Sequence, residues 1–262
     1  VGIVICTCNG YRVGGPGLFM KAHAADAGVL YIIDSIGGTP ESVTEDCTDS
    51  AGGWSYDAGT ATLTLDGFQG EYIEANGDIN IVLKGKNKIT ISAESTEGIK
   101  STGKVTIDDT ISPAQDCLDI YCSDGTESVS MIYTGGFGAD YATYIVGGTV
   151  NLVEENTRRR YVTGISRWAY VENDASLNIN LSADGGRNGV AALLNLNTSG
   201  DTSFRVNSLS SSSYGVYSLD KKGSGDTALA AEGKAKNIDN KFTIGSTGNT
   251  GKITIKGYLT DF

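Results

Sequence analysis

Short runs in which apolar and polar residues alternate recur along most of the chain. Examples are residues 79–83, 105–107 and 177–181, all rich in β-branched or leucine side chains. A period of two places one set of side chains on a buried face and the other in solvent, as in β-strands. No segment of eleven or more residues keeps a helical period of 3.6 residues. The pattern therefore predicts an all-β protein.

A pair formed by an aromatic residue or glycine and a β-branched residue recurs beside these runs. Its copies are Tyr72-Ile73, Gly98-Ile99, Tyr144-Ile145, Gly164-Ile165, Gly189-Val190 and Gly215-Val216. Most steps between copies are 20 to 26 residues, and the single step of 46 predicts a degenerate copy near residues 118–121. Recurrence at this spacing is typical of the coils of a β-solenoid.

Stacking explains why such copies would fold together. One coil cannot bury its apolar row alone, whereas coils about 4.8 Å apart complete both the hydrogen bonds and the core. We therefore predict a parallel β-helix (β-solenoid) of about 7–8 coils over residues 51–262. A β-sandwich of hairpins is the alternative, because short turns also join antiparallel neighbours.

The first 50 residues do not match the repeat. An open solenoid end must be capped or paired, so we expect residues 1–50 to form either a cap on their own stack or a strand donated to the next subunit. In the second case the partner is another copy of this chain. The candidate assembly strand comprises Val1, Ile3, Val4, Ile5, Val29, Tyr31 and Ile33.

Charge and residue usage narrow the function. Asp and Glu outnumber Lys and Arg by 31 to 20, and a net charge of −11 disfavours nucleic acid and anionic membranes as partners. No run of 18 apolar residues predicts a membrane span. His23 is the single histidine, so we predict no catalytic triad and no cofactor. Calcium binding stays open for an acidic chain, although no Asp-x-Asp-x-Asp spacing assigns it.

Aromatic residues concentrate between positions 133 and 170. Exposed rings bind the apolar faces of sugars, and they also form protein interfaces or simply pack in the core. Arg167 and Arg187 are 20 residues apart and would lie above one another, as a basic stripe for acidic sugars. The candidate glycan or partner contacts are Tyr133, Tyr141, Tyr161, Trp168, Tyr170, Arg167 and Arg187.

Five cysteines occur, at positions 6, 8, 47, 117 and 122. Cys117 and Cys122 flank four residues and are the candidate disulfide pair, closing a small loop. The alternative is that both are buried as small hydrophobic side chains.

A family resemblance appears in the segments Gly-Trp-Ser-Tyr-Asp at residues 53–57, Thr-Leu-Thr-Leu at 62–65 and Ala-Asn-Gly-Asp-Ile at 75–79. Together with Leu-Lys-Gly-Lys-Asn-Lys-Ile at 83–89, this pattern resembles secreted surface proteins of Gram-positive bacteria, some described as carbohydrate-binding β-helix proteins. The resemblance covers residues 52–108. It implies a right-handed parallel β-helix on or outside the cell, with glycan binding as an activity. We transfer no binding residue, because matching positions such as Trp54 and Tyr56 are expected to determine the fold.

These features predict a non-enzymatic, extracellular or cell-surface protein that works by contact. The first hypothesis is adhesion or assembly into a filament or surface layer, with subunits linked by N-terminal strand donation. The second is a carbohydrate-binding module that recognises a cell-surface polysaccharide. A polysaccharide lyase is a third, because the chain holds grouped acids such as Asp108-Asp109.

Overall fold

The computed structural model describes residues 29–109, 116–125, 128–154, 162–173 and 175–181, and further along the chain the strands β19 to β25. These parts contain 25 β-strands and one 3₁₀ helix, Ala139–Tyr141. The prediction of an all-β protein is confirmed.

The strands form three sheets, which we call sheets A, B and C. Sheet A holds, in spatial order, β19 (Gly189–Val190), β16 (Val162–Ile165), β13 (Val129–Thr134), β10 (Glu97–Ser101), β7 (Tyr72–Ala75), β1 (Leu30–Ile33) and β2 (Glu41–Val43). Sheet B holds β24 (Lys241–Thr243), β22 (Ser218–Lys221), β20 (Asn195–Ser199), β17 (Trp168–Glu172), β14 (Thr143–Ile145), β11 (Val105–Asp109), β8 (Ile79–Lys84), β5 (Thr62–Asp66), β4 (Trp54–Asp57) and β3 (Cys47–Asp49). Sheet C holds β25 (Ile253–Gly257), β23 (Thr227–Gly233), β21 (Thr202–Ser208), β18 (Ser176–Leu181), β15 (Thr149–Glu154), β12 (Cys117–Cys122), β9 (Lys86–Ile91) and β6 (Gln69–Gly70).

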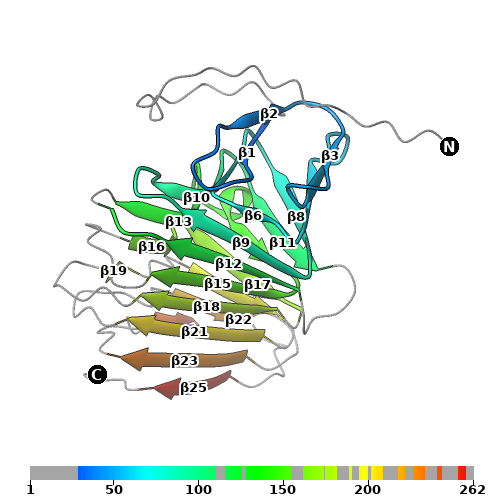
Figure 1. Cartoon of the computed structure of the whole chain (residues 1–262). Helices are drawn as coiled ribbons and strands as arrows, with labels where there is room; N and C mark the ends of the chain where they lie inside the picture. Colours follow the sequence, from blue (N-terminus) through cyan, green and yellow to red (C-terminus); the bar gives the residue numbers. More distant parts are fainter. Residues whose placement is uncertain are drawn as a thin grey trace.

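The chain visits the three sheets in a fixed order. From β6 to β20 each strand in sheet C is followed by one in sheet A and then one in sheet B. Every described pairing between two strands from β5 onward is parallel, so each coil lies on the previous one, as the successive strands of sheet C show in Figure 1. This arrangement of repeated, largely parallel strands is consistent with a β-solenoid. A hairpin sandwich would instead pair consecutive strands antiparallel.

The core lies between the three sheets. Inward-facing side chains repeat in register from coil to coil, as with Ile81, Ile107 and Ile145 in sheet B, all fully buried. The rows in the other sheets include Ile89 and Ile120 in sheet C, equally buried. Each coil thus extends a column of aliphatic side chains that the coil before it leaves open.

The predicted repeat needs one correction. Tyr144-Ile145 lies in sheet B, whereas Ile73 and Ile99 lie in sheet A, where the next member of their row is Ile132 of β13. The steps along this row are therefore 26 and 33 residues. The motif describes any strand with one outward and one inward side chain, so it cannot tell the sheets apart.

The described N-terminal strands fold back onto their own stack. β1 pairs antiparallel with both β2 and β7, and β3, β4 and β5 form an antiparallel meander at the same end of sheet B. Figure 1 shows these blue strands at one end of the molecule. Trp54 and Tyr56 of β4 are buried, and the Trp54 indole donates to Asp34 Oδ2 over 3.3 Å. This end of the stack is therefore covered by the chain itself.

Asn87 lies near the start of β9 in sheet C and connects three consecutive layers of the stack. It is buried, and its Oδ1 accepts the backbone N–H of Phe68 over 2.9 Å. Its Nδ2 faces the carbonyl oxygens of Lys84 and Cys117, each at 3.3 Å. One amide side chain thus satisfies backbone groups that the corner between strands would otherwise leave unpaired.

The predicted disulfide between Cys117 and Cys122 is not formed. The two residues are the first and last of β12, so a rise of about 3.3 Å per residue places their Cα atoms roughly 16 Å apart. A disulfide requires less than about 7 Å. Cys122 instead packs in the core, as the alternative interpretation held, whereas Cys117 is only half-buried, so that interpretation is correct for one of the two residues.

Candidate functional site

The turns that lead from sheet A to sheet B differ in length. Among the described turns that join strands of the parallel coils, three are short: residues 76–78, 102–104 and 166–167. The fourth, residues 135–142 between β13 and β14, has eight residues and contains the 3₁₀ helix. Because β13 lies between β10 and β16, this long loop lies between the turns 102–104 and 166–167 along the stack.

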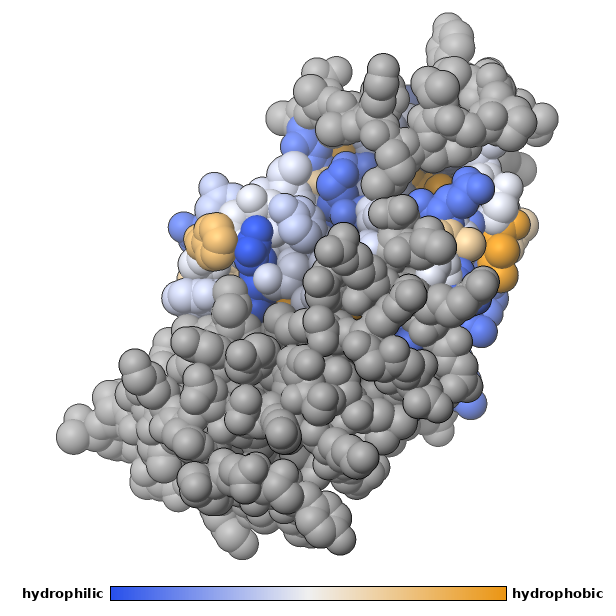
Figure 2. Space-filling view, turned by 90° about the vertical axis from the view of Figure 1, so that its left-hand side faces the viewer, coloured by the Kyte–Doolittle hydropathy of each residue, from blue (hydrophilic) through white to orange (hydrophobic). Residues whose placement is uncertain are grey.

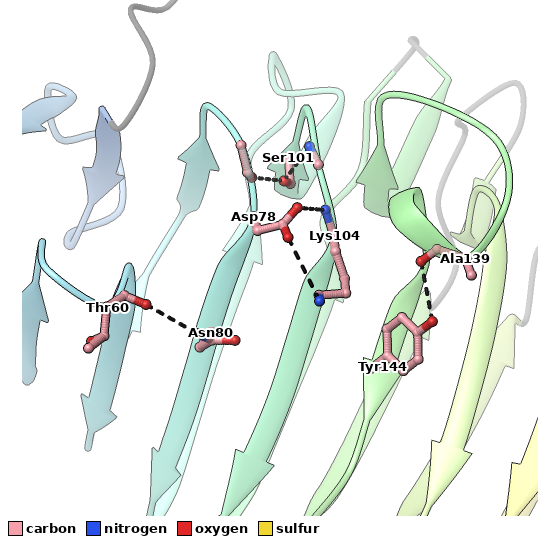
Figure 3. Close-up of polar contacts among 9 residues, drawn as sticks. Thr60, Asp78, Asn80, Ser101, Lys104, Ala139 and Tyr144 are labelled. Atoms are coloured by element: carbon pink, nitrogen blue, oxygen red, sulfur yellow. Dashed lines mark hydrogen bonds and ion pairs between the residues drawn. The ribbon is translucent and has the colours of Figure 1, made fainter.

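Glycines allow the long loop to fold tightly. Gly138 has a φ of 94°, a backbone conformation that favours glycine. At Gly136 a Cβ would lie 2.5 Å from the Tyr141 ring, so this ring packs directly on the Gly136 backbone. The Tyr144 hydroxyl donates to the carbonyl oxygen of Ala139 over 3.2 Å and ties the 3₁₀ helix to β14 (Figure 3).

A pocket of about 450 Å³ lies between this loop and the preceding turns. Residues from three successive coils contribute to it. Its lining consists of Asp78, Thr102, Gly103, Lys104, Ala139, Asp140, Tyr141 and Tyr144.

Asp78 and Lys104 supply opposite charges to one side of the pocket. Asp78 Oδ1 accepts the backbone N–H of Lys104 over 2.8 Å, and its Oδ2 lies 3.7 Å from Lys104 Nζ (Figure 3). The backbone contact orients the Asp78 carboxylate, whereas an exposed ion pair at this distance contributes little to stability. With Asp140, the pocket holds two carboxylates and one ammonium group.

Tyr144 supplies an aromatic surface that is supported from behind. Tyr144 and Tyr170 are in register in sheet B, and their rings stack with centroids 4.3 Å apart and planes 9° from parallel. Lys104 Nζ lies on the pocket side of Tyr144, 5.9 Å from the ring centroid. Burial, followed by the neighbouring Tyr170, raises the pKa of Tyr144 to about 12, so the phenol is neutral at physiological pH.

This combination of groups suits a hydroxyl-rich ligand. The Tyr141 and Tyr144 rings offer apolar faces, and the carboxylates of Asp78 and Asp140 accept hydrogen bonds from hydroxyl groups. Lys104 donates to a hydroxyl or ring oxygen. Aromatic surfaces with a few convergent polar groups are the usual composition of small-ligand sites.

The predicted contact residues fall into three groups. Tyr141 lines the pocket, and Tyr170 stacks behind Tyr144. Trp168 lies two residues before Tyr170 in β17 and so shares its outward face. Tyr133 and Arg167 belong to a separate cluster around Phe137. The remaining two, Tyr161 and Arg187, lie outside the described residues.

Of the residues that line the pocket, Tyr141 alone was predicted as a contact, and the charged and aromatic residues missed are Asp78, Lys104, Asp140 and Tyr144. A signal for two of them existed in the sequence. Asp78 and Lys104 are 26 residues apart, as are Tyr144 and Tyr170, which equals the step between in-register strands at both places. The eight-residue loop that completes the pocket has no counterpart in the repeat.

The candidate assembly strand is divided between described and undescribed parts. Val29, Tyr31 and Ile33 lie in or beside β1, which already has a partner strand on each edge. The backbone of β1 is therefore occupied within its own chain. Val1, Ile3, Val4 and Ile5 lie outside the described residues.

The described part of the chain exposes few large hydrophobic side chains. Figure 2 shows one face of the molecule, on which the coloured hydrophobic areas are small and separate. The large hydrophobic side chains that are exposed in the described part are Ile36, Phe137 and Tyr141. Phe137 and Tyr141 both belong to the loop 135–142, so the exposed hydrophobic side chains near the pocket are confined to this loop and form no broad apolar surface.

Among the described residues, no group of three or more His, Cys, Asp or Glu side chains is placed to hold a metal ion. The same part of the chain has no helix that is long and apolar enough to cross a membrane. Comparison with protein-family models, curated proteins and solved structures finds no match to this chain.

Proposed function

We propose that this chain is a non-enzymatic, extracellular carbohydrate-binding protein whose three sheets close into a right-handed parallel β-helix. Its binding site is the pocket at the turns from sheet A to sheet B, and its ligand is a cell-surface polysaccharide. The observation that carries the proposal is the supported Tyr144 ring beside the carboxylates of Asp78 and Asp140.

The recognition follows from the chemistry of a sugar ring. One face of a pyranose is made of C–H groups and packs on the Tyr144 or Tyr141 ring. The hydroxyls at its edge donate to Asp78 and Asp140 and accept from Lys104. Tyr170 holds Tyr144 in place, so little side-chain freedom is lost when the sugar binds.

The extracellular assignment rests on the resemblance of residues 52–108 to secreted surface proteins. The closed helix is supported by the fixed order in which the chain visits the three sheets. Filament assembly by strand donation receives less support, because β1 is paired within its own chain. That hypothesis now depends on residues 1–28 alone.

The test is a glycan array followed by isothermal titration calorimetry with the tightest-binding glycan. Tyr144→Ala removes the ring that faces the pocket, and we expect at least a tenfold loss of affinity, as for other stacked aromatic contacts. The matched control is Tyr121→Ala. Tyr121 is a half-buried, outward-facing tyrosine of sheet C with Lys88 Nζ 4.4 Å from its ring centroid.

Retained affinity in Tyr121→Ala with a loss in Tyr144→Ala supports the pocket as the binding site. Equal affinities in the two variants would place the site elsewhere. A wild-type protein that binds no glycan on the array would overturn the proposed function.

A further inference from the structure

A second cluster of aromatic and cationic side chains lies on the other side of the long loop. The guanidinium carbon of Arg167 lies 4.2 Å from the centroid of the Phe137 ring and 5.8 Å from that of Tyr133. Phe137 is 69% exposed, although it is a large apolar side chain. The loop thus presents Tyr141 to the pocket and Phe137 to Arg167.

Arg167 has no anionic partner among the described residues. The ion pairs there are Lys100–Glu74 and Lys104–Asp78. Its Nε atom is buried and makes no hydrogen bond. None of the acidic side chains in the described part of the chain is thus paired with Arg167. A buried donor without a partner costs free energy, which an incoming acceptor would recover.

The geometry of Arg167 selects the kind of acceptor. The Phe137 ring lies against the guanidinium group, 4.2 Å from its central carbon, and limits the positions that the group can take. A planar guanidinium edge matches a carboxylate, whose two oxygens accept paired hydrogen bonds. An exposed ring beside it adds an apolar surface for a sugar face.

The position relative to the pocket links the two sites. Arg167 belongs to the turn 166–167, and Lys104 belongs to the turn 102–104, two coils away along the stack. Two coil spacings correspond to about 10 Å. A short oligosaccharide lying along the stack therefore reaches both places.

We infer that Arg167 and Phe137 form a second subsite, which binds a uronic acid residue of the same polysaccharide through its carboxylate. The inference rests on the proposed function and deepens it, because it names an acidic polysaccharide as the ligand class. The pocket binds an uncharged part of the polysaccharide, and the Arg167 subsite binds the carboxylate of a neighbouring uronic acid residue.

The experiment compares oligogalacturonate with its methyl ester, which has the same sugar backbone without the charge. We expect wild-type protein to bind the acid form about tenfold more tightly than the ester in calorimetry, from one charge-assisted contact. Arg167→Gln should remove this difference and leave the affinity for the ester unchanged. Unchanged ester binding also shows that the variant is folded.

Lys100→Gln is the matched control for net charge. Lys100 lies in register with Tyr133 in sheet A, and its Nζ is paired with Glu74 at 2.8 Å. This variant should keep the preference for the acid form. Equal losses in both variants would mean that general electrostatics causes the preference, and the subsite would be disproved.

The remaining outcomes separate the subsite from the proposed function. If the wild-type protein binds the acid and the ester with equal affinity, the subsite is disproved and the proposed pocket is not affected. The same conclusion follows if the protein binds neutral glycans but neither the acid nor the ester of the uronate. If a poly-glutamate peptide competes as well as the uronate, Arg167 recognises carboxylates in general, and the glycan assignment is wrong. Absence of binding to any glycan overturns both proposals.

Discussion

The strands of sheet B and sheet C are paired in the same parallel way, but the polar side chains on their outer faces have different roles. On sheet C, Asn151 Nδ2 donates to Asp119 Oδ1 over 2.6 Å, and Asn178 Nδ2 donates to Asn151 Oδ1 over 2.8 Å. Asp119, Asn151 and Asn178 are in register, so this ladder connects three consecutive coils. Its hydrogen bonds are directed within the protein.

The equivalent row on sheet B runs through Asn80, Thr106, Tyr144 and Tyr170. Here the two tyrosines stack, and Tyr144 lines the pocket together with Lys104, whose Nζ lies 5.9 Å from the ring centroid. The carboxylate of Asp78 is oriented by the neighbouring turn and retains acceptor capacity for a ligand. We conclude that the ladder on sheet C stabilises the stack, whereas the row on sheet B is available for binding. The following predictions test this division.

The largest expected effect concerns Asn87, the buried amide at the start of β9 in sheet C. Asn87→Ala leaves the backbone N–H of Phe68 and the carbonyl of Cys117 without this partner, so we expect a loss of about 3 kcal/mol in the free energy of unfolding. Urea denaturation followed by circular dichroism measures it. The control Asn80→Ala removes an exposed contact to the Thr60 carbonyl (Figure 3) and should cost less than about 0.5 kcal/mol.

If Asn80→Ala destabilises the protein as much as Asn87→Ala, the division between the two faces is wrong. In that case an exposed amide on the outer face of sheet B would contribute as much to stability as the buried Asn87 of sheet C.

A smaller effect is expected within the ladder itself. Asn151→Ala breaks both ladder hydrogen bonds, but the site is partly exposed and water replaces them, so we expect a loss of about 1 kcal/mol. Glycan affinity should stay within twofold of wild type, because the ladder is on another sheet. A clear loss of glycan binding in this variant, with the fold intact, would assign recognition to sheet C instead.

The smallest effect is a difference in alkaline stability. The ordinary pKa of tyrosine is 10.0, and the folded-state pKa of Tyr144 is about 12. Between these values the unfolded chain loses the phenol proton while the folded protein keeps it, so the free energy of unfolding falls as the pH rises through this window. Below pH 10 the group contributes no pH dependence.

Tyr144→Phe should therefore lose less stability than wild type when urea denaturation is repeated at about pH 9 and pH 11. Burial also raises the pKa of Tyr72, ahead of its contact with Glu74, so both proteins weaken at high pH. The difference between them isolates Tyr144. Identical losses would show that the stacked tyrosine titrates normally.

The local pattern of apolar and polar residues was enough to predict the strands and their stacking. It predicted only a small part of the candidate site. Alternation at residues 79–83 and 105–107 reflects burial of one strand face, a property of each segment alone. The pocket depends instead on register between coils, which brings Asp78 beside Lys104. Register is fixed by the lengths of all intervening turns, and these lengths do not follow the repeat.

Individual residues show the same limit. Tyr144 was assigned to the repeat because it precedes Ile145, yet its outward direction makes it a wall of the pocket. Cys117 and Cys122 were placed in a loop, but the alternation through Leu118 and Ile120 identifies a strand, whose extended backbone separates the two sulfurs. In both cases the direction of a side chain mattered more than its neighbours in sequence.

The unequal turns from sheet A to sheet B have a consequence for how such a protein changes over evolution. Turns of two, three and eight residues all connect strands that keep the same register. Insertions at this edge therefore alter the surface without disturbing the coils beneath. A population can vary the loop 135–142 by small duplications or deletions and so sample new ligands. The loop can therefore change what the protein binds while the coils stay the same.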